Sequence, residues 1–132
     1  MNRILTIKKI LQLKNIAIVG MSSKKNRPSY FVSHYMKNKG YNIIPVNPNY
    51  KIIDDLTCYP TLESVIGEVD TVTIFRRSKF VLPIVKSAIF IEAKAIWMQD
   101  NVINNNAAKN AERAGMKVIM NDCMLRQHQL IY

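Results

Sequence analysis

Apolar residues along this chain fall into two alternating patterns. Short apolar runs predict β-strands at residues 16–19, 41–46, 69–75, 93–98 and 117–120. Apolar residues that recur every three or four positions predict helices at 2–13, 28–39, 61–66, 79–92 and 104–114. Glycines and prolines stand at several of the boundaries, where they begin or end regular structure. The pattern therefore indicates an α/β fold.

The order of these elements also predicts how the sheet is built. Strands that alternate with helices are joined by right-handed crossovers and form a parallel sheet. We expect a single domain over residues 1–132, with a doubly wound five-stranded parallel sheet and helices on both faces. Residues 49–59 are expected to form an irregular loop, and the polar tail at 121–132 carries no pattern that predicts an element.

The first strand leads into a turn suited to phosphate. It runs into Gly20, a short polar loop with three cations follows, and Pro28 and Ser29 can open a helix. Backbone N–H groups and the positive end of the helix dipole favour an anion at such a turn. In an open parallel sheet this turn lies at the carboxyl ends of the strands, where ligands bind. The sequence therefore predicts a nucleotide-like ligand here.

Missing residues narrow the choice of nucleotide. A dinucleotide fingerprint needs three glycines after the first strand and an acid after the second. Here Gly20 stands alone, and no acid occurs before Asp54. This disfavours NAD, whereas NADP stays an alternative because Lys24, Lys25 and Arg27 could hold its 2′-phosphate. No P-loop sequence occurs.

Positive charge is concentrated in the first part of the chain. The formal net charge is +10, and residues 1–53 hold ten Lys or Arg with no Asp or Glu. An anionic partner should be attracted to the surface that this part forms. A polyphosphate cofactor fits that charge, and a nucleic acid is the third hypothesis, with few aromatic residues beside the lysines to support it.

Other features restrict the class of protein. No apolar run reaches the length of a membrane helix, and the basic N-terminus lacks the features of a secretory signal. The two cysteines, Cys58 and Cys123, are far apart and predict reduced thiols in a cytoplasmic protein. No catalytic constellation accompanies His34, which we expect to be packed. These observations favour a binding module without activity of its own, and the oligomeric state is left open.

Seven short motifs occur in an order that resembles a known family. They are IVGMS at 18–22, RPS at 27–29, PVNP at 45–48, YPTL at 59–62, VTIFR at 72–76, WMQ at 97–99 and Cys123. Together they resemble the small stand-alone CoA-binding domain proteins, which are similar to the N-terminal CoA-binding domain of the succinyl-CoA synthetase alpha subunit. The resemblance implies a Rossmann-like sheet with coenzyme A, free or acylated, lying across the carboxyl ends of the strands.

The resemblance also implies which residues contact the ligand. They are Gly20, Met21, Ser22, Lys24, Lys25, Arg27, Ser29, Val46, Asn47, Pro48, Phe75, Arg76, Trp97 and Gln99. The glycine turn would face the pyrophosphate, the cations after it would meet the 3′-phosphate or pyrophosphate, and residues 46–48 would border the adenosine. The residues after the third and fourth strands would line the rest of the groove.

Two acids depart from the family pattern, and two residues keep alternative roles. Asp100 stands where the family usually has glycine, and Asp122 where it usually has arginine. Trp97 could pack in the core instead of lining the groove. Cys123 could be a structural thiol or could form a mixed disulfide with coenzyme A.

Overall fold

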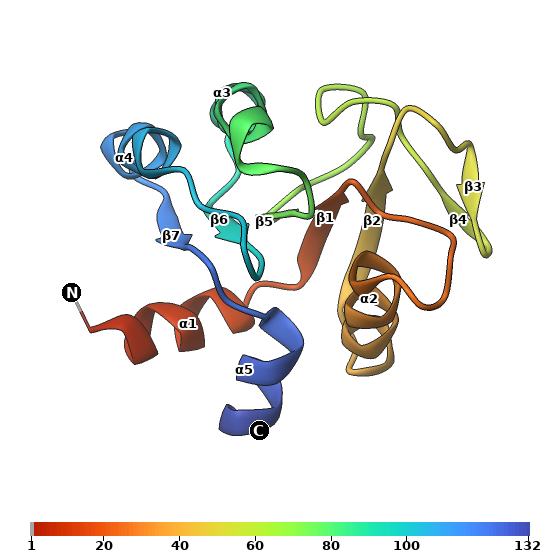
Figure 1. Ribbon diagram of the computed structural model, residues 1–132, viewed down its shortest axis with the longest axis horizontal. Helices are drawn as coiled ribbons and strands as arrows, with labels where there is room; N and C mark the ends of the chain where they lie inside the picture. Colours follow the sequence, from red (N-terminus) through yellow and green to blue (C-terminus); the bar gives the residue numbers. More distant parts are fainter. Residues whose placement is uncertain (1) are drawn as a thin grey trace.

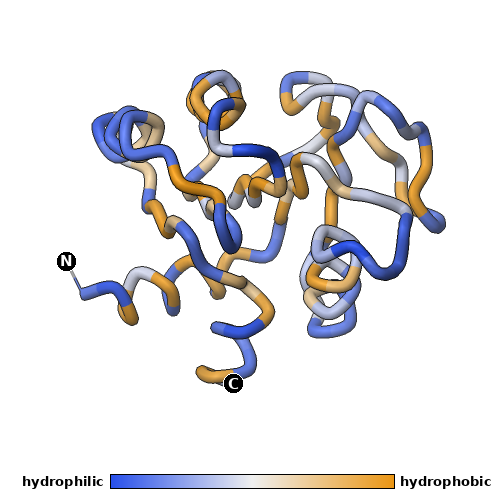
Figure 2. Tube along the Cα trace, in the orientation of Figure 1, coloured by the Kyte–Doolittle hydropathy of each residue, from blue (hydrophilic) through white to orange (hydrophobic). Residues whose placement is uncertain are grey.

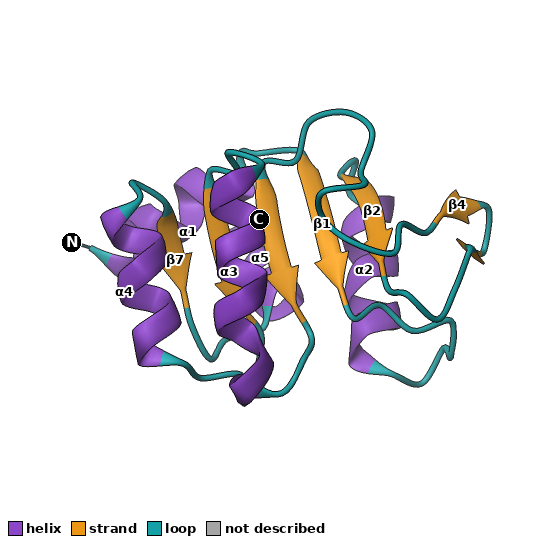
Figure 3. Ribbon diagram, turned by 90° about the horizontal axis from the view of Figure 1, so that it is seen from above, coloured by secondary structure: helices purple, strands orange, loops and turns teal. Residues whose placement is uncertain are grey.

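Five parallel strands form the centre of the molecule. The computed structural model describes residues 2–132. The strands are β1 (Asn15–Val19), β2 (Asn42–Val46), β5 (Thr71–Ile74), β6 (Ala95–Met98) and β7 (Lys117–Ile119). They lie in the order β2-β1-β5-β6-β7, every pair is parallel, and the arrows in Figure 3 point the same way. This confirms the predicted doubly wound sheet.

Five helices cover both faces of this sheet. They are α1 (Arg3–Leu11), α2 (Pro28–Asn38), α3 (Val81–Phe90), α4 (Asn105–Arg113) and α5 (Met124–Ile131), with a 3₁₀ turn, η1, at Ser78–Phe80. Figure 1 shows α3 and α4 on one face and α1, α2 and α5 on the other. Of the part of the chain that the structure describes, no helix combines the length and apolar character needed to cross a bilayer.

The sheet separates two apolar cores because successive side chains of a strand point to opposite faces. In β1, Ala17 and Val19 pack toward α3, whereas Ile16 and Ile18 pack toward α1 and α2. Trp97 of β6 is fully buried on the second face, and its indole N–H donates to the Asp122 carbonyl at 2.9 Å. Figure 2 shows apolar colour along the strands, whereas the helices carry both apolar and hydrophilic residues.

Local signals explain where several helices begin. The Asn104 side chain accepts from the Ala107 N–H at 2.9 Å and caps α4, at the start of the helix predicted over 104–114. Arg27 occupies the N-cap of α2 and Pro28 its first helical position. The helix that opens after the glycine turn therefore starts where the sequence predicts.

The prediction of a helix at 61–66 is wrong. Thr61 and Ser64 bond each other's backbone N–H groups through their hydroxyls, and this reciprocal pair holds a tight turn instead. Ile66 is 84% exposed, so the segment offers little apolar surface to stabilise a helix. Short helices depend on packing, and this segment lacks it.

The irregular loop predicted at 49–59 contains a small hairpin. Strands β3 (Ile52–Ile53) and β4 (Leu56–Thr57) pair antiparallel, and Asp54 at the turn has φ of +54°. Aspartate tolerates this left-handed conformation better than most residues. The tail at 121–132, for which the sequence predicts no element, holds α5.

The sheet order creates a switch point at the centre. β1 lies between β2 and β5, so the chain leaves β1 toward one edge and later returns to its other side. Val19 is in register with Ile74, which brings the carboxyl ends of β1 and β5 together. Ligands of open α/β sheets bind at such a point.

Candidate functional site

Gly20 is required by its surroundings. Its φ is +89°, and a Cβ added there would lie 2.6 Å from the carbonyl oxygen of Phe75, closer than real Cβ contacts. Its N–H donates to Val46 at 2.8 Å. The turn therefore passes between the ends of β2 and β5 with no room for a side chain. The glycine that we predicted as part of a phosphate turn is in the first place a packing requirement.

The loop after Gly20 satisfies several of its own backbone groups. The Ser22 N–H donates to Ser29 Oγ at 3.0 Å, and the Lys24 N–H donates to Ser22 Oγ at 3.0 Å. The Asn47 side chain donates to the Met21 carbonyl at 3.0 Å and ties the loop to the end of β2. The loop is thus preorganised, and the N–H groups of Ser22 and Lys24 are already used. Those two backbone donors are therefore not available to an anion.

A cavity of about 860 Å³ lies beside this loop, at the carboxyl ends of β1, β5 and β6. Its cationic lining residues are Lys24, Arg27, Arg76, Arg77 and Arg126. Among the described residues that line it, Asp100 is the one acid, and its carboxylate accepts two hydrogen bonds from Arg126, at 2.8 and 3.1 Å. Figure 2 shows hydrophilic colour in the β1–α2 loop and in the turn after β5. The cavity is a cationic site.

A second cavity of about 320 Å³ continues from the first toward the end of β2. Val46, Asn47 and Pro48 line it, and it shares Gly20 and Arg76 with the larger cavity. We call the two together the carboxyl-end groove. It passes over the ends of β2, β1, β5 and β6 in their spatial order, so an elongated ligand can lie along it.

Two aromatic side chains help to shape this groove. The Arg76 guanidinium lies 4.7 Å from the centre of the Phe80 ring, which holds the arginine by a cation–π contact. Tyr50, which also lines the groove, receives hydrogen bonds from Ser23 and Ser22 that lower the pKa of its phenol. The first contact lies within the segment after β5, whereas the second links the loop after β1 to the loop after β2, and neither is evident from the sequence pattern.

Gln99 and the start of α5 form the far end of the groove. The Gln99 side chain is 3% exposed, and its Oε1 accepts from the Met124 N–H at 3.2 Å. Within the described residues its Nε2 has no hydrogen-bond partner. Cys123, half-buried, precedes Met124 and lines the same cavity. Gln99, whose buried donor has no partner in the described part of the chain, and Cys123 therefore line the same end of the groove.

Most of the residues named from the resemblance line this groove. They are Gly20, Ser22, Lys24, Arg27, Ser29, Val46, Asn47, Pro48, Phe75, Arg76 and Gln99. Lys25 is exposed but lines neither cavity. Met21 is 3% exposed and Trp97 0%, and both side chains pack in the core on the α1, α2 and α5 face. The expectation that Trp97 lines the groove is wrong, because the alternation of side chains along β6 turns the indole into the core.

Other lining residues are not among those named from the resemblance. Tyr50, Arg77, Asn101, Val102 and Arg126 all line the larger cavity. Arg126 lies in α5, and its approach to the groove depends on where that helix packs. Arg77 directly follows Arg76, and this adjacency was the one sequence signal that could have included it.

Asp122 has a structural role. Its side chain is 9% exposed and accepts hydrogen bonds from Arg3, Arg126 and Gln127. Burial by itself raises the pKa of this carboxyl, but these bonds outweigh it and hold the pKa below its usual value. The acid that departs from the family pattern thus connects α1 to α5 and does not face the groove.

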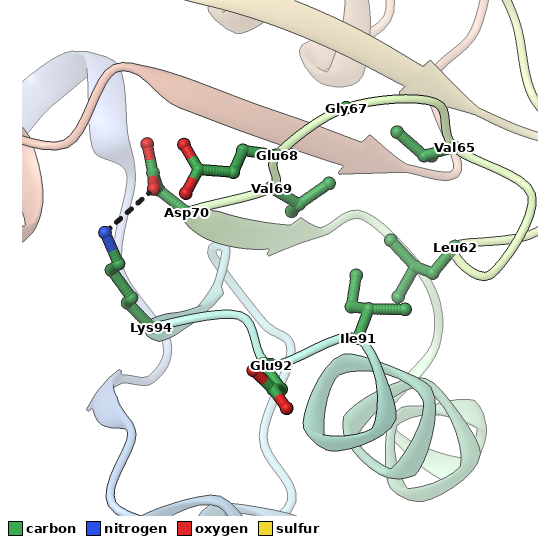
Figure 4. A pocket seen from close by; sticks show the side chains of 9 residues that line it. All are labelled: Leu62, Val65, Gly67, Glu68, Val69, Asp70, Ile91, Glu92 and Lys94. Carbon is green, nitrogen blue, oxygen red and sulfur yellow. Dashed lines mark ion pairs between the residues drawn. The ribbon is translucent and has the colours of Figure 1, made fainter.

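A smaller hollow of about 210 Å³ lies at the opposite, amino ends of β5 and β6 (Figure 4). Asp70 there pairs with Lys94 at 3.4 Å, drawn as the dashed line. The other oxygen of Asp70 accepts from the Asn15 N–H at 3.1 Å. We call this hollow the amino-end pocket. The Asp70 carboxylate holds strand ends together, and Glu68 and Glu92 also line the pocket.

Comparison with known proteins places the chain among CoA-binding domains. The profile of the family described as "CoA binding domain" matches residues 14–129. The uncharacterized protein YneT of Bacillus subtilis is 35% identical over 123 residues, which cover 92% of this chain and 91% of that protein. An ADP-forming acetate–CoA ligase of Methanocaldococcus jannaschii is 25% identical over 126 residues, 89% of this chain but only 18% of the ligase.

Solved structures agree with this. A hypothetical protein from Pyrococcus horikoshii superposes with a TM-score of 0.94 at 35% identity, and the match covers 98% of this chain and 92% of that one. A Thermus thermophilus structure superposes with a TM-score of 0.93 at 23% identity and supports the fold alone. The stand-alone relatives therefore match this chain almost end to end, whereas the ligase matches it as one segment of a longer protein.

Proposed function

This chain belongs to the CoA-binding domain family, and from that premise we propose that it binds coenzyme A or an acyl-CoA in the carboxyl-end groove without catalysing a reaction by itself. The observation that carries the proposal is the position of a cationic groove at the switch point of the sheet. Coenzyme A is long, carries about four negative charges on its phosphates, and needs such a receptor.

The groove offers a distinct environment to each part of this ligand. The adenosine would lie near Val46 and Pro48, in the smaller cavity beyond β2. The phosphates would meet Lys24 and Arg27, at the start of α2, where the helix dipole adds favourable potential. The pantetheine arm would then cross Phe75 toward the end of β6. This order follows the spatial order of the strands.

Charged side chains are expected to supply the strongest phosphate contacts. The Ser22 and Lys24 N–H groups donate to serine hydroxyls, so these two groups do not donate to a phosphate as the loop N–H groups of a dinucleotide site do. Arg27 can donate a bidentate pair of hydrogen bonds to a phosphate, whereas Lys24 acts as a point charge. Arg27 is thus the residue whose loss should weaken binding most.

Isothermal titration with coenzyme A tests the proposal. We expect Arg27→Ala to weaken binding about 10-fold or more, the effect of losing a charged hydrogen bond of 1.5–3 kcal/mol. Arg113→Ala is the matched control, since Arg113 is an exposed arginine in the last turn of α4 that lines neither cavity. The Arg113→Ala variant should bind coenzyme A with the same affinity as the wild type.

Two further titrations separate this proposal from its alternatives. NADP carries a phosphate on its ribose but lacks a pantetheine arm, so it should bind more weakly than coenzyme A. Binding of mixed-sequence DNA or RNA with a steep salt dependence, and no heat with coenzyme A at low salt, would show that the basic surface serves nucleic acid instead. Equal affinity for NADP and coenzyme A would contradict the assignment of the groove beyond β5.

A further inference from the structure

The far end of the groove brings together two groups that the binding of phosphates does not use. Cys123 is half-buried at the N-cap of α5, and Gln99 follows the end of β6. Both line the same cavity as Arg27 and Ser22. A ligand anchored at the glycine turn can therefore extend along one continuous cavity until it reaches this thiol.

The unpartnered donor of Gln99 is the observation that indicates a ligand group here. The side chain is 3% exposed and its Nε2 has no partner among the described residues. Its orientation is determined, because Oε1 accepts from the Met124 N–H at 3.2 Å and a flipped amide would set two donors against each other. A buried donor left unpaired costs about 1–3 kcal/mol, which a ligand carbonyl in the cavity would recover.

We propose that Cys123 is a thiol-exchange site for coenzyme A in its disulfide form, and that Gln99 positions the ligand for the exchange. This inference rests on the proposed function, since the phosphates would anchor the ligand at the glycine turn. The last amide carbonyl of pantetheine is separated from its sulfur by one amide nitrogen and two methylene groups. A hydrogen bond from Gln99 Nε2 to that carbonyl would hold the sulfur beside Cys123.

The exchange conserves atoms and electrons. The Cys123 thiol loses its proton, and its sulfur attacks one sulfur of the ligand's S–S bond. A new S–S bond forms between Cys123 and one coenzyme A, while the other coenzyme A leaves as a thiolate and takes up a proton. Cys123 is oxidised, the leaving sulfur is reduced, and the oxidant is the disulfide ligand itself.

The second cysteine provides a contrast within the same chain. Cys58 is 5% exposed, its Sγ donates to the Asn47 carbonyl at 3.4 Å, and burial raises the pKa of its thiol. The thiolate is the reactive form, so a buried thiol with a raised pKa reacts slowly. Cys58 also lines neither cavity of the groove. Exchange should therefore occur at Cys123 alone.

Intact-protein mass spectrometry tests the exchange on the reduced full chain. After incubation with the symmetrical disulfide of coenzyme A, we expect one adduct that a reductant removes, located at Cys123 by peptide mapping. Cys123→Ser should give no adduct, and Cys58→Ser should form it as fast as the wild type. Glutathione disulfide measures the thiol's general accessibility, and it should react at least ~10-fold more slowly, since it lacks the nucleotide anchor.

The role of Gln99 has its own readout. Gln99→Met preserves side-chain length but removes both the Nε2 donor and the Oε1 acceptor of the Met124 N–H. Loss of the donor should slow exchange with the coenzyme A disulfide about 10-fold, the loss of one hydrogen bond of about 1.4 kcal/mol. The rate of this variant with glutathione disulfide should not change. Equal slowing with both disulfides would mean that Gln99 only supports α5, and would overturn its positioning role.

Failure of this inference can be told apart from failure of the proposed function. If calorimetry shows that reduced coenzyme A binds but its disulfide gives no adduct, the exchange site is wrong and the binding function stands. If both disulfides react at the same rate, Cys123 is merely an accessible thiol and the inference is overturned. If reduced coenzyme A gives no heat, the proposed function itself fails.

Discussion

The two ends of the sheet carry hollows of opposite character. The carboxyl-end groove has a cavity of about 860 Å³ with Arg27, Arg76 and Arg77 on its lining, and an unpartnered amide at Gln99. The amino-end pocket has about 210 Å³, and its Asp70 is engaged by Lys94 and by the Asn15 N–H (Figure 4). Among the described residues, Glu68 and Glu92 also line the amino-end pocket, so its carboxylates outnumber its one lysine, Lys94. Of the two hollows, only the cationic groove therefore suits an anionic ligand.

The largest expected effect concerns the turn at the groove. Gly20→Ala should lower the free energy of unfolding by roughly 3 kcal/mol, because left-handed strain and a clash with the Phe75 carbonyl act together. Gly40→Ala is the control: Gly40 has φ of +95° but nothing within 4 Å of the added Cβ, so strain alone should cost about 1–2 kcal/mol. Urea denaturation measures both. Equal losses would mean that the close approach to Phe75 has no energetic weight.

Asp70, in the amino-end pocket, should contribute to stability and not to coenzyme A binding. Asp70→Ala removes the acceptor of the Asn15 N–H and should lower the unfolding free energy by about 2 kcal/mol. Asp70→Asn keeps an oxygen for that N–H and should cost less. Coenzyme A affinity, followed by calorimetry, should be unchanged in both variants. A several-fold loss of affinity would break the distinction between the two ends.

Asp100, in the carboxyl-end groove, should weaken the binding of coenzyme A. Asp100→Asn removes one of the two carboxylate partners of Arg126, leaving the pair with Asp122 and freeing Nη1 of the guanidinium for an anion. We expect coenzyme A to bind about 3-fold more tightly, with a stability change below about 1 kcal/mol because the ion pair is exposed. Glu112→Gln, an exposed acid of α4, controls for the change in net charge. Weaker binding by Asp100→Asn alone would indicate that the pair must stay intact to shape the groove.

The smallest expected effect is a loss of stability at low pH, caused by protonation of His128. This residue lies in α5, the helix that forms one wall of the groove. Burial, and then Lys39 and Lys14, lower the pKa of His128 from its usual 6.5. His128 therefore takes up a proton more readily in the unfolded chain than in the folded protein. The free energy of unfolding should fall as the pH drops through 6.5 toward the pKa of His128 in the folded protein. Urea denaturation at about pH 8 and 5.5 should show this loss in the wild type and less of it in His128→Gln. An identical loss in both would assign the effect to other groups.

The location of charge illustrates what sequence reasoning can and cannot predict. Residues 1–53 carry the whole formal excess, yet of the five cations on the larger cavity only Lys24 and Arg27 come from them. Arg76, Arg77 and Arg126 come from the balanced remainder of the chain. Net charge adds up along a sequence, whereas a binding surface collects its charges from segments that folding brings together.

Strand and helix placement was predictable where one local cause dominated. The strands follow from apolar runs buried on both faces, and Pro28 and Asn104 set the starts of their helices. The turn at 61–66 and the helix α5 were not predictable in this way. The turn depends on the reciprocal hydrogen bonds between Thr61 and Ser64. Helix α5 depends on hydrogen bonds to Asp122, such as that from Arg126, and on packing against distant elements.

By itself, the sequence determined the parallel sheet, the single-glycine turn with its cations, and the exclusion of the three-glycine dinucleotide turn, because these depend on residue types at fixed spacing. Only the tertiary structure decided that Gly20 is required by the Phe75 carbonyl, that Trp97 belongs to the core, and that Gln99 and Cys123 line the same cationic groove. Those outcomes depend on which strand ends lie side by side and which face a side chain takes. Such relations join residues far apart in the chain, and local pattern carries no information about them.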